Sequence, residues 1–176
     1  MKTRVALTFS IALLFGLASV ANAQLRAGSP EDSAFSKIES EKNSDAKLAL
    51  LLDFESKFPN TSPKTLAMVY LMAMDIYSEK DNKAKIAEYG DKAIGKDAEN
   101  VSALLRVSRN YSSEKTNLPK AVEYAEKAKS IIGNMRSMPA PTGQSEEQWK
   151  QWLDANAASA EQLASYAKML QNITRP

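Results

Sequence analysis

The sequence contains neither cysteine nor histidine among its 176 residues. Without cysteine, disulfides, thiolate nucleophiles, Cys-ligated zinc and covalently attached c-type haem are excluded. Without histidine, catalytic triads built on histidine, zinc hydrolase sites and His-ligated haem are excluded as well. The sequence also has no glycine-rich phosphate loop, no paired metal-ligand spacing and no nucleophile elbow. We therefore expect no enzyme, no cofactor and no metal site.

The chain also has little net charge of either sign, with 23 Lys and Arg residues against 21 Asp and Glu residues. Two of the basic residues, Lys2 and Arg4, stand at the start, and the rest of the chain is balanced. A chain of zero formal charge has no bulk electrostatic attraction for nucleic acid or for anionic membranes. We therefore expect no nucleic-acid partner.

Residues 1–23 have the three parts of an export signal peptide. Two basic residues precede an apolar run over 5–20, and the triplet at 21–23 is an A-x-A cleavage site. An uncleaved membrane anchor is the alternative, but the apolar run is shorter than the ~20 residues of a bilayer span. We expect cleavage after Ala23, with no membrane span left in the mature chain. Because the leader looks bacterial, we expect a periplasmic or secreted product.

After a flexible lead over residues 24–30, the remaining chain shows only helical periodicity. Apolar residues recur at spacings of three and four, and no stretch alternates with a period of two. Breaks between helices are expected at residues 43–45, 59–62, 81–82, 95–100 and 112–118. The pattern predicts an all-α fold.

Individual residues mark the ends of these helices. Ser62 and Asn100 are expected N-caps, and Pro119 is expected to start a helix that ends before Gly133 as its C′ residue. Residues 138–144 form a linker by composition. Ser145 and Gln148 then fit a capping box for a last helix that runs to about residue 172.

The helices repeat along the chain. The segment 70–77 aligns with 104–111 at an offset of 34 residues, and 86–93 aligns with 121–128 at an offset of 35. One residue is therefore inserted in the turn of the second unit. Tandem helix pairs at a period near 34 resemble the tetratricopeptide repeat (TPR) family.

The small residues of the second helices strengthen this resemblance. Gly90 and Ala93 in one unit, and Ala125 and Ala128 in the next, stand where the family uses small side chains to let paired helices approach. Residues 31–58 fit less well and resemble a degenerate terminal unit. The resemblance implies a TPR-type solenoid of about three helix pairs over residues 31–137, the linker over 138–144 and a capping helix over 145–176.

The resemblance also implies where a partner binds, because the first helices of successive TPR pairs line a concave face. The positions that it assigns to this face are Met68, Leu71, Asp75, Glu79, Leu105, Arg109 and Ser112. Asp75 and Arg109 occupy equivalent positions one repeat apart. One interpretation is that they are ordinary surface charges, either solvated or joined in an exposed ion pair. The other is that they form a polar spot on an apolar groove. The Lys and Asn set with which chaperone-binding members hold a terminal carboxylate is absent.

The last helix carries an apolar stripe, for which there are two interpretations. The stripe consists of Trp149, Leu153, Ala160, Leu163, Ala164, Ala167 and Leu170, with Trp152 beside it. It either packs on the preceding helix and caps the array, or leaves a tryptophan exposed as an interface anchor. We favour the cap, because an exposed stripe of this size is an aggregation liability.

These features together predict a non-catalytic interaction or scaffold module of the bacterial cell envelope. It would dock a peptide or protein on the concave face of a TPR array. The alternative is a structural or assembly subunit that packs through the end of the array or through the last helix.

Overall fold

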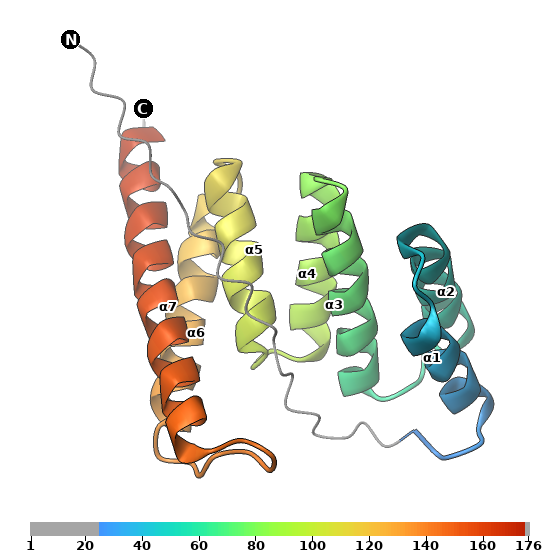
Figure 1. Cartoon of the computed structure of the whole chain (residues 1–176). Helices are drawn as coiled ribbons and strands as arrows, with labels where there is room; N and C mark the ends of the chain where they lie inside the picture. The colour runs from blue at the N-terminus through green and yellow to red at the C-terminus, as the bar shows by residue number, and fades with distance from the viewer. Residues whose placement is uncertain (1–24, 175–176) are drawn as a thin grey trace.

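The computed structural model describes residues 25–174, which form seven α-helices and no β-strand (Figure 1). The prediction of an all-α fold is therefore confirmed for this part of the chain. The helices are α1 (Pro30–Ser40), α2 (Ser44–Lys57), α3 (Pro63–Glu79), α4 (Lys83–Lys96), α5 (Val101–Ser113), α6 (Leu118–Met135) and α7 (Glu146–Thr174). The expected leader over residues 1–23 lies outside the described residues.

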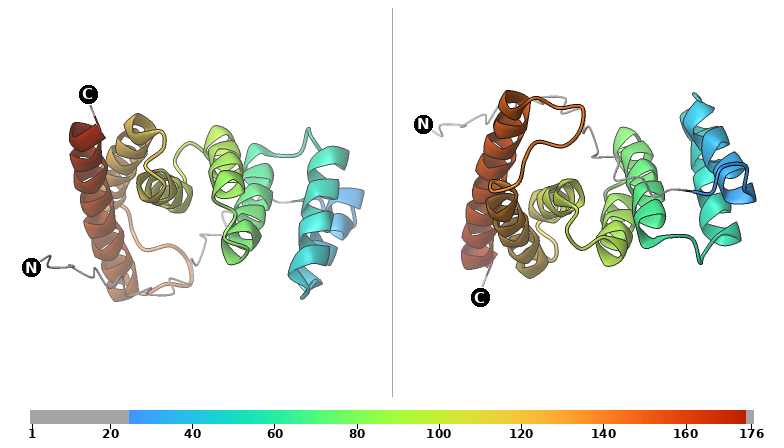
Figure 2. Two further views of the ribbon diagram at one scale, coloured as in Figure 1. Left: turned by 90° about the horizontal axis from the view of Figure 1, so that it is seen from above. Right: turned by 90° about the horizontal axis from the view of Figure 1, so that it is seen from below.

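The first six helices form three antiparallel hairpins, α1 with α2, α3 with α4 and α5 with α6, which stand in one row (Figures 1 and 2). Seen as in Figure 1, α3 and α5 lie in front of α4 and α6. Each helix packs on its neighbour in the chain, and α7 closes the row against both α6 and α5. The row therefore places α3 and α5 side by side on one face.

A side-chain cap stands at the start of every described helix except α6. In α2 to α5 the side chain of the cap residue accepts a hydrogen bond from the backbone N–H three residues further on. These cap residues are Asn43, Ser62, Asn82 and Asn100. At α7, Ser145 Oγ accepts from the Gln148 N–H at 3.2 Å, and Gln148 Oε1 accepts from the Ser145 N–H at 3.0 Å. The predicted caps at Ser62 and Asn100 and the capping box are confirmed.

The expected start of α6 differs from the structure by one residue, and its expected C-terminal end is wrong. The helix begins at Leu118, so Pro119 lies inside its first turn, and it continues to Met135, so Gly133 is a helical residue. A glycine inside a helix costs only about 1 kcal/mol. Packing of Met135 against the core offsets this cost and carries the helix past the glycine.

The turns of the second and third hairpins have the same backbone geometry. Asp81 and Lys115, 34 residues apart, are left-handed with φ of 52° and 53°. In both turns the next N–H bonds to the carbonyl five residues back at 2.9 Å, Asn82 to Tyr77 and Thr116 to Tyr111. This is the Schellman arrangement. The repeat seen in the sequence is therefore also a repeat of structure, and Asn117 follows as the inserted residue before α6.

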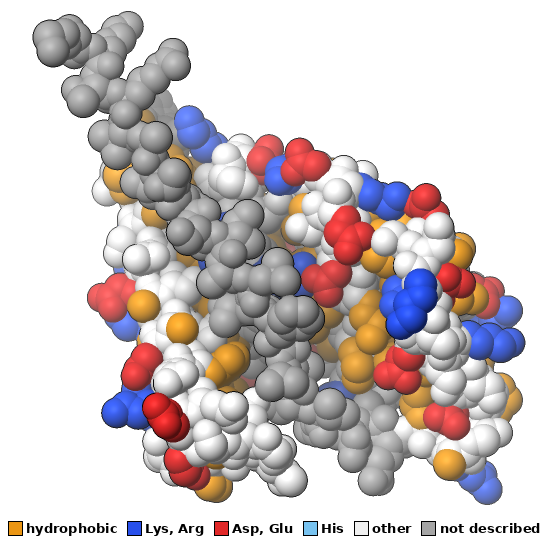
Figure 3. All heavy atoms as spheres, in the orientation of Figure 1, with side chains coloured by type: hydrophobic (Ala, Val, Ile, Leu, Met, Phe, Trp, Pro, Cys, Tyr) orange, Lys and Arg blue, Asp and Glu red, His pale blue; other side chains and the backbone are white. Residues whose placement is uncertain are grey.

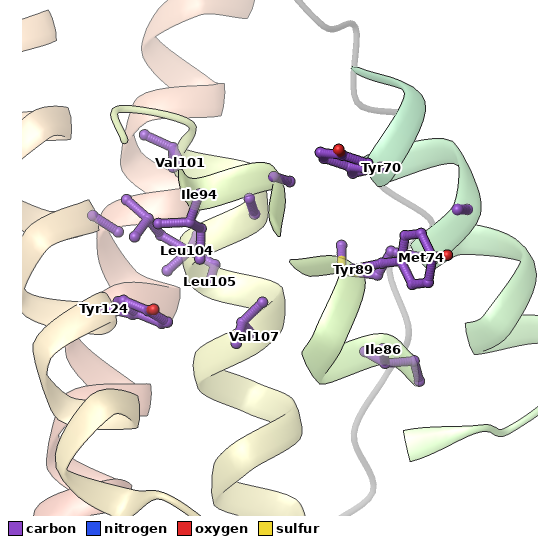
Figure 4. Packing of buried hydrophobic residues seen from close by; sticks show 14 of the residues in the cluster. Tyr70, Met74, Ile86, Tyr89, Ile94, Val101, Leu104, Leu105, Val107 and Tyr124 are labelled. Carbon is purple, nitrogen blue, oxygen red and sulfur yellow. The ribbon is translucent and has the colours of Figure 1, made fainter. Parts of the chain in front are cut away.

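Small residues let the helices of these two hairpins pack closely. Ala93 and Ala128 are completely buried, and Gly90 has space for no more than hydrogen, because a Cβ there would clash with Val107. Ser108 Oγ reaches the main chain of α6 and donates to the Ala121 carbonyl at 2.7 Å. Figure 4 shows the larger apolar side chains that fill the remaining space, with Tyr70 and Tyr89 between α3 and α4.

The apolar stripe of α7 is buried. This holds for each of the seven residues that the sequence assigns to the stripe, of which Trp149 is the first and Leu170 the last. Trp152 is partly buried and stacks on Trp149, with ring centroids 5.1 Å apart. The long helix therefore covers the last hairpin along its length, in agreement with the cap interpretation, and neither tryptophan is an exposed anchor.

Candidate functional site

The surface shared by α3 and α5 is the candidate site, and we call it the front face. Met68, Leu71 and Met72 of α3 lie partly buried on it, at the spacing that places residues on one side of a helix. Hydrophobic side chains gather over α3 on this side of the molecule (Figure 3). On α5, Arg106 occupies the position equivalent to Met72, and Arg109 the position equivalent to Asp75. The front face therefore has an apolar half on α3 and a basic half on α5.

The structure brings some of the expected partner-binding residues to the front face and buries others. Met68 and Leu71 are partly exposed, and Asp75 and Arg109 are exposed. Glu79, also exposed, lies at the end of α3, where its carboxylate accepts a hydrogen bond from Ser44 Oγ at 2.9 Å.

Leu105 and Ser112 are not available on the front face, since only 5% of Leu105 and 1% of Ser112 are exposed. These two positions were expected on the concave face only because of their place in the repeat. In the structure, however, α5 packs on α7 as well as on α4 and α6. A helix with three neighbours buries positions that a helix with two would expose. Residues 105 and 112 therefore belong to the interior.

Asp75 is paired, although not with its repeat equivalent. Its carboxylate forms an ion pair with Arg106, which joins α3 to α5 across the front face. Arg109 instead donates a hydrogen bond to Ser159 Oγ of α7 at 3.2 Å. Among residues 25–174 no carboxylate forms an ion pair with Arg109. Arg109 is thus an exposed cation whose charge the described part of the chain does not neutralise.

The sequence interpretation overlooked Arg106. The 34-residue offset aligns it with Met72, so one unit has a cation where the other has an apolar side chain. Both side chains are partly exposed. A comparison of every outward position between the two units, and not only of the acidic and basic pair at 75 and 109, would have found it.

A partly buried carboxylate links the second hairpin to the third. Asp91 of α4 accepts hydrogen bonds from the hydroxyls of Tyr111 at 2.7 Å and Tyr124 at 3.0 Å, and from Lys120 Nζ at 3.1 Å. Burial raises the pKa of Tyr111 to about 12, with a further contribution from the bond to Asp91. The same carboxylate raises the pKa of Lys120. Both donors therefore keep their protons at neutral pH.

A second carboxylate links the first hairpin to the second. Glu55 of α2 binds Lys92 Nζ of α4 at 3.0 Å, and this ammonium lies 4.4 Å from the ring centroid of Tyr89. Burial, followed by the nearby Glu55 carboxylate, raises the pKa of Tyr89 to about 12. The second and the third hairpin thus each receive a carboxylate from the hairpin before it. These contacts fix the relative positions of the hairpins and hence of the helices on the front face.

Comparison with known proteins gives no match among family models, curated proteins or solved structures. Within residues 25–174 no group of three or more acidic side chains is placed to hold a metal ion. No helix of the same part of the chain is both long enough and apolar enough to cross a bilayer.

Proposed function

We propose that this chain is a non-catalytic protein-interaction module of the TPR kind that binds a peptide or protein segment on its front face. The observation that carries the proposal is the exposed Arg109 of α5, which no carboxylate among residues 25–174 neutralises, on the same side of the row as the partly exposed apolar residues of α3 (Figure 1). A segment with a carboxylate beside an apolar side chain complements both halves of this surface.

The rigid spacing of the hairpins supports the same role. Asp91 and Glu55 each tie one hairpin to the next, and Asp75 ties α3 to α5. A surface held in place before binding loses less conformational freedom when a partner docks. The front face is therefore suited to recognition by a fixed pattern of contacts.

We also propose that the protein works outside the cytoplasm, in the periplasm or as a secreted product. The basis is the basic, apolar and A-x-A pattern of residues 1–23. The intact mass of the protein recovered from the cell envelope should correspond to a chain that begins at Gln24. A mass that retains residues 1–23 would contradict cleavage.

Selection from a random peptide library tests the binding site. We expect enriched peptides to combine an acidic residue with neighbouring apolar residues. Arg109→Glu should weaken their binding by about tenfold, because it replaces attraction with repulsion at the carboxylate. Lys96→Glu makes the same charge change at an exposed position of α4, away from the front face, and is the matched control.

Two results would overturn the proposal. One is a library that yields no peptide binding above background. The other is equal loss of binding in Arg109→Glu and Lys96→Glu, which would show a response to net charge and not to the front face. A structural role through the last helix is the second candidate function, and the exposed apolar residues of α7 favour it.

A further inference from the structure

The side of α7 that points away from the rest of the protein carries no charge over residues 155–173. We call it the outer face; its exposed residues are Ala155, Ala158, Gln162, Ser165, Tyr166, Met169, Asn172 and Ile173. Among the described helices α7 packs mainly on α6 and α5, and it stands at the end of the row (Figure 1). The terminal helix of a helical array normally has a polar outward side.

Three of the five large apolar side chains that are exposed in residues 25–174 lie on this face. Tyr166 is 43% exposed, Met169 47% and Ile173 71%. Their spacing of three and four residues aligns them along one side of the helix. Lack of charge combined with exposed aromatic, methionine and aliphatic side chains is typical of the centre of a protein interface.

The two charged residues in this stretch both lie toward α6. Glu161 is 3.8 Å from Lys129 Nζ, and Lys168 Nζ is 2.6 Å from Glu126. They therefore flank the outer face on one side. Since they are seven residues apart, they lie at nearly the same angle around the helix.

The outer face has a small half and a large half. Its first part presents Ala155 and Ala158, and its last part presents Tyr166, Met169 and Ile173. If a second α7 lies across it in the opposite direction, large side chains of each helix meet small ones of the other. A two-fold axis that runs between the two helices, at the level of residues 164 and 165, also places Glu161 of one copy opposite Lys168 of the other.

We propose that the outer face of α7 is a homodimer interface, in which α7 of one copy packs antiparallel on α7 of a second copy. The face is self-complementary in size and in flanking charge, which a two-fold interface requires because each patch meets its own copy. The interface uses no residue of the front face. Its failure would therefore leave the peptide-binding proposal standing.

Light scattering of the purified protein over a range of concentrations tests this interface. The mass should rise from that of one chain toward that of two as the concentration increases. Met169→Glu should raise the dissociation constant of the dimer by about tenfold or more, because it places an unpaired carboxylate in apolar contact. Leu52→Glu introduces the same charge at another exposed apolar position, on α2, and should leave the dimer unchanged.

A charge exchange tests the antiparallel direction. Glu161→Lys and Lys168→Glu should each weaken the dimer, since each places like charges opposite one another across the axis. The double variant should restore it, because the opposite charges face each other again. A parallel pairing would place each residue opposite its own copy, and the double variant would not recover.

Crosslinking gives an independent readout, because the natural chain has no cysteine. Ser165→Cys lies next to the proposed axis and should form a disulfide-linked dimer under mild oxidation. Ser130→Cys, at an exposed position of α6, should not. A chain that stays monomeric at every concentration, or a dimer that survives Met169→Glu and is lost in Leu52→Glu, would overturn the proposal.

Discussion

The first hairpin and the two later ones have the same topology but are built differently. The turns between α3 and α4 and between α5 and α6 contain a left-handed residue, Asp81 or Lys115. The connection between α1 and α2 leaves α1 through Glu41 in an extended conformation, with φ of −70° and ψ of 131°. The chain therefore reverses its direction through two different turn conformations in one protein.

Packing between the helices differs in the same way. The first hairpin is filled by aromatic rings, with Phe35 and Phe54 6.0 Å apart edge to face and Phe54 and Phe58 5.0 Å apart. The second hairpin also contains aromatic pairs, which Tyr89 forms with Tyr70 and Tyr77, but the later hairpins in addition bury Ala93 and Ala128 completely. Rings fill a wide gap between helices, whereas small side chains close it. The first hairpin should therefore be sensitive to loss of volume, and the later ones to gain of volume.

Phe54→Ala should have the largest effect. Phe54 is buried at the centre of the aromatic cluster, and removal of a buried phenylalanine ring costs about 3–5 kcal/mol. Chemical denaturation measures this loss, and hydrogen exchange should locate it in α1 and α2. Leu52→Ala, on the exposed side of the same helix, is the control and should change stability little. Equal loss of protection in α5 and α6 would show that the first hairpin is not a distinct unit.

Ala128→Leu should destabilise the third hairpin by about 1–3 kcal/mol, because a larger side chain overpacks a filled contact. Ala128 is fully buried, whereas Ala49 on α2 is exposed. Ala49→Leu makes the same substitution and should leave the melting temperature nearly unchanged. If both variants melt like the parent protein, close approach at Ala128 is not what holds α6 in place.

Two glycines of α4 give a smaller and sharper comparison. Gly90→Ala should destabilise by about 1 kcal/mol, because the clash with Val107 exceeds the gain in helix propensity. Gly95→Ala should stabilise by up to about 1 kcal/mol, because no atom lies within 4 Å of the added methyl group. Thermal unfolding of the two variants should shift in opposite directions. Stabilisation by both would mean that α4 and α5 are not in tight contact at Gly90.

Alkaline pH should have the smallest effect and should act on the later hairpins. Burial raises the pKa of Tyr89 and Tyr111 to about 12, while tyrosine in an unfolded chain ionises near pH 10. Between these values the folded protein binds more protons than the unfolded chain, so stability falls as the pH rises. The effect stays small up to about pH 10, because only there do the tyrosines of the unfolded chain begin to lose their protons.

Denaturation at several pH values from 9 to 12, with hydrogen exchange, checks this prediction. The first hairpin contains no tyrosine, so protection should decline first in α3–α6. Tyr111→Phe should flatten the decline, and Tyr166→Phe, at an exposed site on α7, serves as control. A decline that begins in α1 and α2 would contradict the assignment to the buried tyrosines.

The sequence by itself determined the helices, most of their caps and the repeat. Ser62, Asn100 and Ser145 bond to backbone groups three residues away, and the inserted residue falls in the turn where the two offsets change. These features depend on contacts within a few residues, so the local pattern contains the information. The end of α6 differs from the expectation because packing of Met135 against the core outweighs the local preference of Gly133.

Only the tertiary structure decided which residues of the candidate site are exposed and which charges are paired. The alignment of the two repeats could not show that Leu105 and Ser112 are buried. It also could not show that Asp75 pairs with Arg106, or that Arg109 contacts Ser159. Each of these facts depends on where helices distant in the sequence lie against one another, above all on α7, which follows a loop over residues 136–145. The docking angle of α7 comes from side-chain packing against α5 and α6, and not from the local sequence of the loop.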